Sequence, residues 1–154
     1  MQDQQNTVHF NLALLDELKA LFANTADFST AMLPRIYAKG IVFVDPVHKV
    51  EGIAALQEYF DRSYSDVISC RFEFIGEAVE GETAVLRWIM QLSHRKLAAG
   101  RTVSLPGVSW LTMSSSEPEK IGYHEDFYDL GALVYEQIPI VGRIIAHIKA
   151  RMIG

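Results

Sequence analysis

"VISCRFEFIGEAVEG", residues 67–81, and "ETAVLRWIMQLSHRK", residues 82–96, carry the clearest strand patterns in the chain. In the second stretch, positions 86, 88, 90 and 92 are all apolar, whereas Arg87 and Gln91 stand between them. This alternation is typical of a strand that buries one of its faces. The segment Glu80-Gly81-Glu82, where the two stretches meet, predicts a hairpin turn.

Two more strands are predicted on the carboxyl-terminal side of this hairpin. They are "RTVSLPGVSWLTMSS" at 101–115 and "IGYHEDFYDL" at 121–130, and a loop that contains Pro118 joins them. We therefore expect four long strands in succession, with further hairpin connections between neighbours. A helix anywhere in residues 83–93 would contradict this arrangement.

Helical patterns occupy much of the amino-terminal half. Residues 7–23 carry an apolar stripe at helical spacing, which consists of Phe10, Leu14, Leu18 and Leu21. Residues 25–40 predict a second, short helix, which Asp27 or Ser29 could cap and Gly40 could end. A short strand at 41–46 and a third helix near 52–65, after a turn at Gly52, complete this half.

Helices first and long strands afterwards indicate an α+β fold. We expect helices packed on one face of a strongly curved antiparallel sheet, which together enclose a cone with an internal pocket. The sequence contains no internal repeat and no linker that could divide it, so residues 1–154 are expected to form a single domain. The chain closes in a helix from about residue 131, broken or kinked near Pro139 and Gly142.

The composition argues against several classes of protein. The net charge is −5, and nucleic-acid-binding proteins usually show a basic patch or stripe instead. Cys70 is the single cysteine, so it cannot form an internal disulfide or a cysteine-based zinc site, and we interpret it as a small core residue. Residues 1–10 show no basic segment followed by an apolar run, so we expect no signal peptide and a cytoplasmic location.

Residues 123–129, "YHEDFYD", combine three carboxylates, a histidine and three aromatic rings. In a strand, His124, Asp126 and Tyr128 share one face, and the four other residues share the opposite face. Neither row is plainly apolar or plainly polar. The alternation alone therefore leaves open which row points into the protein.

Three motifs and the order of the elements resemble the nuclear transport factor 2-like superfamily. This group includes ketosteroid isomerases, SnoaL-like polyketide cyclases and limonene epoxide hydrolases. The motifs are "IVFVDPVHKVEGIAALQEYF" at 41–60, "VSWLTM" at 108–113 and "KIGYHEDFYDLG" at 120–131, and the resemblance spans roughly residues 8–135. It implies the cone-shaped fold, which carries many unrelated activities, so the chemistry has to be argued from the residues.

The resemblance also implies which faces point into the cone. It turns the row of His124, Asp126 and Tyr128 inward, and it places Asp45 on the pocket side of the first strand. The pocket residues predicted in this way are Phe43, Leu86, Trp88, Met90, Ser109 and Tyr128. Tyr59 is a further pocket candidate, because on the helix after Gly52 it could either close the pocket or pack in the core.

Steroid isomerisation is disfavoured by the departures from the family pattern. Asp45 matches the general base of the ketosteroid isomerases, an Asp before Pro on the first strand. These enzymes also need an oxyanion hole made of a Tyr and a protonated carboxylic acid. The matching positions here are Leu21 or Phe22, and Ser109, and they cannot supply that pair.

Epoxide hydrolysis is also disfavoured, whereas cyclase chemistry is not. Limonene epoxide hydrolases use an Asp–Arg–Asp group with one Asp on a middle strand, but this chain has no Asp or Glu between Glu82 and Glu117. SnoaL-like cyclases take an acid–base carboxylate or histidine from the later strands. His124 and Asp126 could fill that role, so this analogy is the least contradicted.

Asp126, His124 and Asp45 are therefore the candidate catalytic residues. Apolar surroundings disfavour the charged form of a carboxylate, which suits Asp126 to acid–base work. His124 could shuttle a proton or orient Asp126. Structural roles remain as alternatives: hydrogen bonds that hold the strand for Asp126 and His124, and a turn cap for Asp45.

Two classes of function stay open on this basis. The first is an acid–base isomerase, cyclase or hydratase that acts on a hydrophobic small molecule. The second is a module that binds a small ligand or another protein without turnover. We expect no metal, because the histidines lie on different elements without ligand spacing, and no cofactor, because no glycine-rich phosphate loop is present.

Two further expectations concern partners. Trp110 has the opposite parity to Ser109, so it should face the outer side of the sheet and contribute to a homodimer interface. The closing helix carries isoleucines on one side and basic residues around the rest. It could cap the cone, pack on a partner subunit or lie on a membrane surface, and membrane contact is the least favoured of the three.

Overall fold

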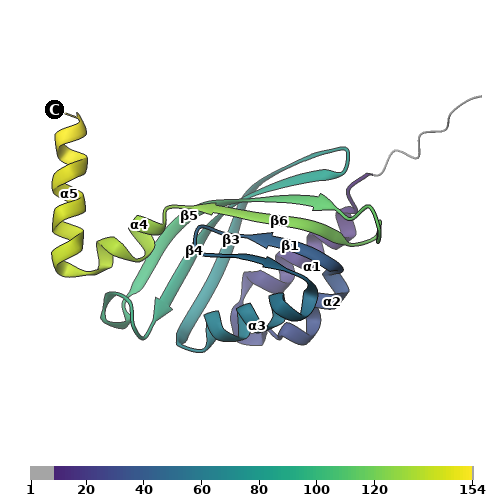
Figure 1. The fold of residues 1–154 in the computed structure, drawn as a ribbon, viewed down its shortest axis with the longest axis horizontal. Helices are drawn as coiled ribbons and strands as arrows, with labels where there is room; N and C mark the ends of the chain where they lie inside the picture. The colour runs from purple at the N-terminus through teal and green to yellow at the C-terminus, as the bar shows by residue number, and fades with distance from the viewer. Residues whose placement is uncertain (1–8, 154) are drawn as a thin grey trace, which may run out of the picture.

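One curved sheet and a set of helices make up residues 9–153, the part of the chain that the computed structural model describes (Figure 1). The six strands follow the order β2-β1-β6-β5-β4-β3 across the sheet. In chain order the elements, with η for a 3-10 turn, are α1 (Leu12–Ala23), η1 (Thr25–Asp27), η2 (Thr30–Met32), α2 (Leu33–Ile36), β1 (Tyr37–Val44), β2 (Lys49–Glu51), α3 (Ile53–Tyr64), β3 (Val67–Glu80), β4 (Thr83–His94), η3 (Ala98–Gly100), β5 (Thr102–Met113), β6 (Ile121–Tyr128), α4 (Leu130–Leu133), η4 (Tyr135–Gln137) and α5 (Pro139–Ile153).

The predicted run of four long strands is confirmed. β3, β4, β5 and β6 pair antiparallel in succession, and residues 83–93 are strand throughout. The predicted hairpin turn lies between β3 and β4, where Gly81 has φ of 56°, a value that favours glycine. The Gly81 carbonyl also accepts a hydrogen bond from the Phe10 N–H at 2.7 Å, which ties the start of the described chain to this turn.

The edge of the sheet was only partly predicted. β1 pairs parallel to β6, so the sheet is mixed rather than wholly antiparallel. β2, a three-residue strand that the sequence did not predict, pairs antiparallel with β1. The pattern within a strand shows which face it buries, but it does not show which distant strand lies beside it.

α1 confirms the first predicted helix with a later start. Its cap is Asn11, whose side chain accepts hydrogen bonds from the N–H groups of Ala13 and Leu14. Residues 7–8 of the predicted helix lie outside the described residues. α1, α2 and α3 lie on one side of the sheet, as predicted (Figure 1). The residues that α1 buries are Leu14, Leu15, Leu18, Leu21 and Phe22.

The second predicted helix is largely wrong. Residues 25–40 form two 3-10 turns, a four-residue helix and the first half of β1. Ser29 does cap η2, but Gly40 lies inside the strand instead of ending a helix. The strand begins at Tyr37 because Tyr37 and Ala38, each only 1% exposed, belong to the packed interior. Burial thus overrides the helical propensity of this short segment.

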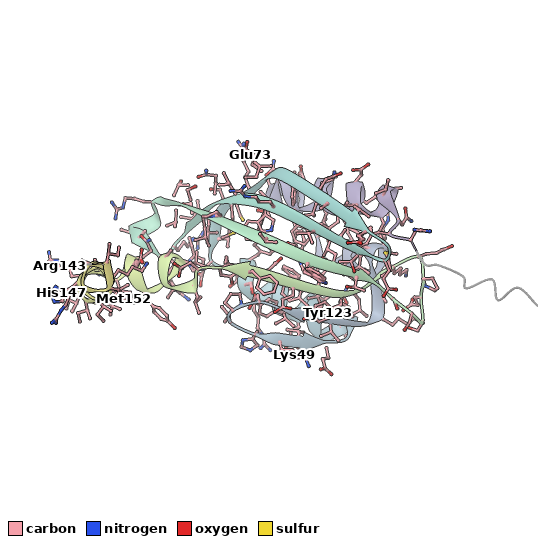
Figure 2. All side chains as sticks on the ribbon, turned by 90° about the horizontal axis from the view of Figure 1, so that it is seen from above. Lys49, Glu73, Tyr123, Arg143, His147 and Met152 are labelled. Carbon is pink, nitrogen blue, oxygen red and sulfur yellow. The ribbon has the colours of Figure 1, made fainter. Side chains whose placement is uncertain are left out.

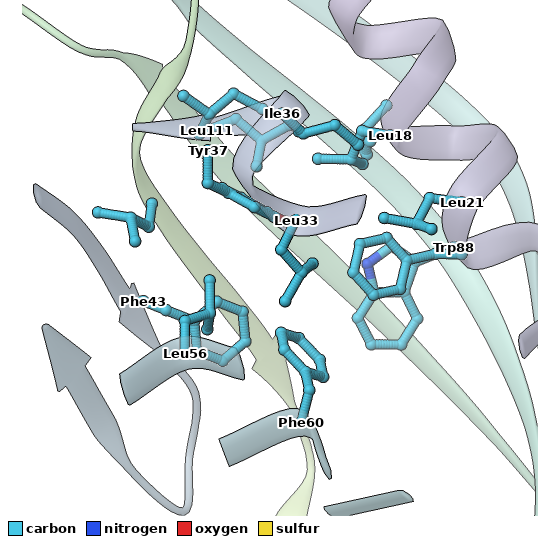
Figure 3. Close-up of a cluster of buried hydrophobic side chains, with 14 of the residues drawn as sticks. Leu18, Leu21, Leu33, Ile36, Tyr37, Phe43, Leu56, Phe60, Trp88 and Leu111 are labelled. Atoms are coloured by element: carbon cyan, nitrogen blue, oxygen red, sulfur yellow. The ribbon is translucent and has the colours of Figure 1, made fainter. Parts of the chain in front are cut away.

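The core fills the space between the inner face of the sheet and the helices (Figure 3). The alternation predicted for β4 is confirmed, since Ala84, Leu86, Trp88, Met90 and Leu92 are all buried. Trp88 lies directly over Gly107 of β5, where an added Cβ would stand 2.1 Å from the indole. Cys70 is buried as predicted, and burial raises the pKa of its thiol to about 12.

The closing segment breaks at the predicted place. A short α4 leads through η4 to α5, which begins at Pro139. α5 packs on η4 and points away from the sheet (Figure 1). The interpretation of this helix as a cap over the cone is therefore wrong.

Candidate functional site

A cavity of about 750 Å³ opens between α3 and the inner face of the sheet. Its walls are mainly apolar and aromatic, as expected of a small-molecule site. A second, deeper space of about 40 Å³ shares several of these walls. The side chains that line both spaces are Phe60, Tyr64, Phe72, Trp88 and Asp126. Asp126 therefore stands where the open cavity meets the deeper one.

Asp126 accepts a hydrogen bond from Ser109 of β5. The indole Nε1–H of Trp88 donates to the Ser109 Oγ at 2.9 Å. Since an indole can only donate, the Ser109 hydroxyl is free to donate in turn, and it does so to Asp126 Oδ1 at 2.5 Å. β5 and β6 bring the pair together, because Ser109 and Asp126 are directly opposite in the ladder.

His124 holds the same carboxylate oxygen from the side. Its Nε2 lies 2.8 Å from Asp126 Oδ1, and its Nδ1 lies 2.8 Å from the Tyr37 hydroxyl. An ionised carboxylate only accepts, so Nε2 of a neutral imidazole carries the hydrogen and Nδ1 accepts from Tyr37. Burial, then the negative charge of Asp126, raises the pKa of Tyr37 well above its ordinary value, so Tyr37 keeps its proton.

Two chains of donors thus end on one atom, Asp126 Oδ1. Among residues 9–153, no hydrogen bond reaches the second oxygen, Oδ2. Every fully buried polar side-chain atom of these residues has a partner, so Oδ2 must be open to the cavity that Asp126 lines. The site therefore presents one free carboxylate oxygen on an oriented carboxylate.

Two phenols lie beside this carboxylate. Tyr64 at the end of α3 and Tyr128 at the end of β6 line the open cavity, and neither hydroxyl has a hydrogen-bond partner among the described residues. Burial raises the pKa of both phenols, and the charge of Asp126 raises it further. Both therefore stay neutral and can donate a hydrogen bond to a ligand.

Asp45 does not join this group. Its Oδ1 accepts from the N–H groups of Val47 and His48, each at 2.8 Å, and its Oδ2 accepts from the Tyr59 hydroxyl. These bonds are those of a turn cap. Asp45 acts on the site only from a distance, because its charge contributes, after burial, to the raised pKa of Tyr128.

The mouth of the cavity carries charges that pair with one another. Lys49 lies 2.8 Å from Glu51, and Arg62 pairs with Glu58 one turn earlier on α3. All four residues line the cavity near solvent. Asp126 is thus the charge that stands deepest in the cavity walls, next to the aromatic rings.

The predicted pocket residues fall into two groups. Tyr59, Trp88, Met90, Ser109 and Tyr128 each line the open or the deeper cavity. Phe43 and Leu86 instead lie in the packed core, at 2% and 0% exposure. Phe43 contacts the His124 ring, with the ring centroids 4.9 Å apart, so it supports the site without lining it.

The predicted orientation of β6 is confirmed. His124 is 3% exposed, and Asp126 and Tyr128 line the cavity, so the even row points inward. On the opposite face, Phe127 is 51% exposed, and Glu125 accepts a hydrogen bond from Tyr123. The inward row faces Trp88 and, across the deeper cavity, Leu18 of α1, as expected.

Two residues of the site escaped the sequence-based prediction. Tyr37 was placed in a helix that is mostly absent, so no pattern could bring it to His124. Tyr64 was detectable, because it follows Phe60 by four positions and therefore lies on the same face of α3. Their rings stack with centroids 5.8 Å apart.

In residues 9–153, His, Cys, Asp and Glu side chains do not gather in groups of three or more that could hold a metal ion. No helix in that range is long and apolar enough to cross a membrane. The expectation of no metal and no cofactor stays a prediction.

Comparison with solved structures shows the fold shared with proteins of low sequence identity. A hypothetical protein with a ketosteroid isomerase-like fold from Catenulispora acidiphila, in complex with trimethylamine, has 14% identity and a TM-score of 0.67, over 80% of this chain and 90% of its own. A protein from Jannaschia sp. CCS1, provisionally called a SnoaL-like polyketide cyclase, has 16% identity and a TM-score of 0.67, over 86% of this chain and 94% of its own.

The sequence comparisons define the family. A search of curated proteins found no match. The family model for the SnoaL-like domain matches residues 18–121, a range that includes Tyr37, Trp88 and Ser109 and ends before His124. Since this match covers more than half of the chain, the protein belongs to the SnoaL-like domain family.

Proposed function

We propose that this protein is an acid–base enzyme that moves a proton on a small, largely apolar carbonyl compound, as an isomerase, cyclase or hydratase does. The observation that carries the proposal is the state of Asp126: one oxygen is held by His124 and Ser109, and the other is open to an apolar cavity. A base oriented in this way can reach a substrate without a search through rotamers.

The reaction follows from the two kinds of group in the cavity. Asp126 Oδ2 takes a proton from the carbon next to the carbonyl, and the C–H electron pair moves to form the enolate. The carboxylic acid then returns the proton to another carbon, which gives an isomer. Alternatively, the enolate carbon attacks a second carbonyl of the same molecule, which closes a ring, and the alkoxide formed from that carbonyl takes the proton back from Asp126. His124 and Ser109 act as positioning residues, because they touch Asp126 and not the reacting carbon.

Tyr64 and Tyr128 supply a pair of donors for the developing oxyanion, which the positions matched to the ketosteroid isomerases lack. Donors that are already in place are effective because they need no reorganisation as charge develops. The raised pKa of each phenol keeps the hydrogen in place at neutral pH. Both hydroxyls lie in the same cavity as Asp126, which agrees with a carbonyl compound as the ligand.

The test is exchange of the α-hydrogens of 2-tetralone, a compact apolar ketone, followed by proton NMR in heavy water. We expect the protein to accelerate exchange, and Asp126→Asn to lower that acceleration by about 100-fold or more. Glu125→Gln, the neighbouring carboxylate on the outer face, should leave it unchanged. Catalysis that survives in Asp126→Asn with a normal fold would refute Asp126 as the base.

Binding without turnover is the second candidate, and the aromatic lining favours a cation as its ligand. Tyr59, Tyr64, Trp88 and Tyr128 surround a cavity that holds the Asp126 carboxylate, an arrangement suited to cation–π contacts. The Catenulispora protein with this fold was crystallised with trimethylamine. Saturable binding of trimethylammonium by NMR titration, weakened in Asp126→Asn, together with no exchange of 2-tetralone, would favour this candidate.

The outer face of the sheet supports a homodimer as a further part of the proposal. Trp110 is 45% exposed there, and Phe127 lies diagonally across the β5–β6 ladder from it. An exposed pair of large rings suits a protein interface. Sedimentation should show a dimer that Trp110→Lys converts to a monomer, and a monomeric parent protein would contradict it.

A further inference from the structure

The last segment of the chain exposes an unusual amount of apolar surface. Of the fifteen large apolar side chains that are exposed in residues 9–153, seven lie between Tyr135 and Ile153. No residue of α5 is buried. Four of the seven recur at every fourth position along α5 and therefore form one row. They are Ile140, Ile144, Ile148 and Met152, with exposures of 74%, 55%, 53% and 80%.

A basic row lies beside the apolar row on the same helix. α5 contains no Asp or Glu, whereas the whole chain carries a net charge of −5. Arg143, His147 and Arg151 are four residues apart and share one side. Among residues 9–153, no ion pair involves Arg143 or Arg151, although Lys149 pairs with Glu136. Figure 2 shows Arg143, His147 and Met152 at the far end of the molecule, away from the sheet.

The position of α5 connects this surface to the candidate site. α4 precedes it, and Leu133 of α4 is one of the residues that line the open cavity. The chain passes from Leu133 through η4 directly into α5. A surface that held α5 would therefore lie near the same end of the molecule as a wall of the cavity.

We propose that α5 binds the surface of an anionic lipid bilayer, with its axis parallel to the membrane. A helix of 15 residues is about 22 Å long, shorter than the hydrocarbon core of a bilayer. An exposed apolar row beside basic side chains suits a helix that lies in the headgroup region, because the row enters the acyl boundary and the cations meet lipid phosphates. The proposal does not depend on the enzymatic function.

A cap over the cone is one of the three roles that the sequence allowed for this helix. The structure removes that alternative, because α5 points away from the cavity. A symmetric contact between two copies of α5 would join the apolar rows but would also bring the two basic rows close together. Like charges oppose such a contact, whereas an anionic surface satisfies both rows.

The experiment is co-flotation of the full chain with two kinds of vesicle at low ionic strength. One kind is phosphatidylcholine alone, and the other is phosphatidylcholine mixed with an equal amount of phosphatidylglycerol. We expect at least about tenfold tighter binding to the mixed vesicles, since each basic side chain near an anionic surface contributes about fivefold. Added salt should weaken this binding.

Matched variants separate the two rows. Ile144→Glu with Ile148→Glu should lower binding to the mixed vesicles by at least about tenfold, whereas Ile68→Glu with Ile75→Glu, at exposed positions of β3, should leave it unchanged. Arg143→Gln with Arg151→Gln should remove the preference for anionic lipid. Circular dichroism verifies the fold of each variant.

Three outcomes would overturn the proposal. The first is no binding of the parent protein to mixed vesicles at low ionic strength. The second is binding that Ile144→Glu with Ile148→Glu leaves intact. The third is a dimer in sedimentation that this double variant dissociates, without any vesicle binding, which would assign the row to a second copy of the chain.

Discussion

α1 and α5 are two amphipathic helices of one chain with opposite surroundings. α1 has 12 residues and buries five of them beneath the sheet, whereas α5 has 15 residues and buries none. Both carry an apolar row at helical spacing. An apolar row therefore shows that a helix has an apolar face, but not what covers that face.

The two helices also differ in their relation to the candidate site. Leu18 of α1 lines the deeper cavity next to His124 and Asp126, so this helix is part of the wall that holds the site. α5 packs on η4 and contributes no residue to the hydrophobic core. Substitutions in α1 should therefore change both the stability of the protein and the geometry of the candidate site. Substitutions in α5 should change neither.

The largest expected effect separates buried from exposed apolar side chains. Leu18→Ala should lower the free energy of unfolding by about 2–5 kcal/mol, because Leu18 is 2% exposed and its loss leaves a cavity. Ile148→Ala on α5 should change it by about 0.5 kcal/mol or less. Urea unfolding followed by circular dichroism measures both. A destabilisation of similar size in the two variants would mean that α5 is covered in solution.

Two glycines, Gly107 in the body and Gly142 in α5, should show the same difference with a smaller loss of stability. Gly107→Ala would force a Cβ to 2.1 Å from the Trp88 indole, and we expect a loss of about 1–3 kcal/mol because that indole is packed in the core. Gly142→Ala would meet the Glu136 carbonyl oxygen at 2.5 Å. It should displace α5 from η4 with little change in global stability.

Thermal unfolding and amide hydrogen exchange distinguish these results. Gly107→Ala should lower the melting temperature, whereas Gly142→Ala should only speed exchange around the hydrogen bond from the Gly142 N–H to the Ile138 carbonyl. Unchanged exchange there in Gly142→Ala would show that α5 does not rest on η4 as described.

The smallest of these effects is the pH dependence of the free energy of unfolding. Burial, followed by nearby negative charges, raises the pKa of Tyr64 above its ordinary value of 10.0. The folded state then holds the Tyr64 proton at a pH where the unfolded state releases it. The contribution to stability is therefore complete below about pH 10, and above it falls by up to about 1.4 kcal/mol per pH unit.

Tyr64→Phe should flatten this alkaline loss of stability, measured by urea unfolding at pH 8 and at pH 11. Tyr135→Phe, at an exposed position near α5, is the matched control and should retain the slope of the parent protein. An identical slope in Tyr64→Phe and the parent would contradict the burial of Tyr64 in the cavity wall.

Elements with long and regular patterns could be predicted from the sequence alone. The alternation in β4, the turn at Gly81 and the stripe of α1 each arise from local spacing, so they could be predicted without tertiary information. The inward row of His124 and Asp126 needed a further step. Parity grouped the two residues, and only the resemblance to a family selected their face.

The composition of the site and the position of the last helix depend on long-range packing, so they emerged only from the folded structure. Tyr37, Ser109 and Asp126 lie on three different strands, and their contacts depend on the parallel pairing of β1 with β6 and on the β5–β6 register. Asp45 became a turn cap because β1 ends one residue earlier, at Val44. The physical reason is common to these cases: local sequence fixes which face of an element is apolar, whereas long-range packing fixes what that face meets.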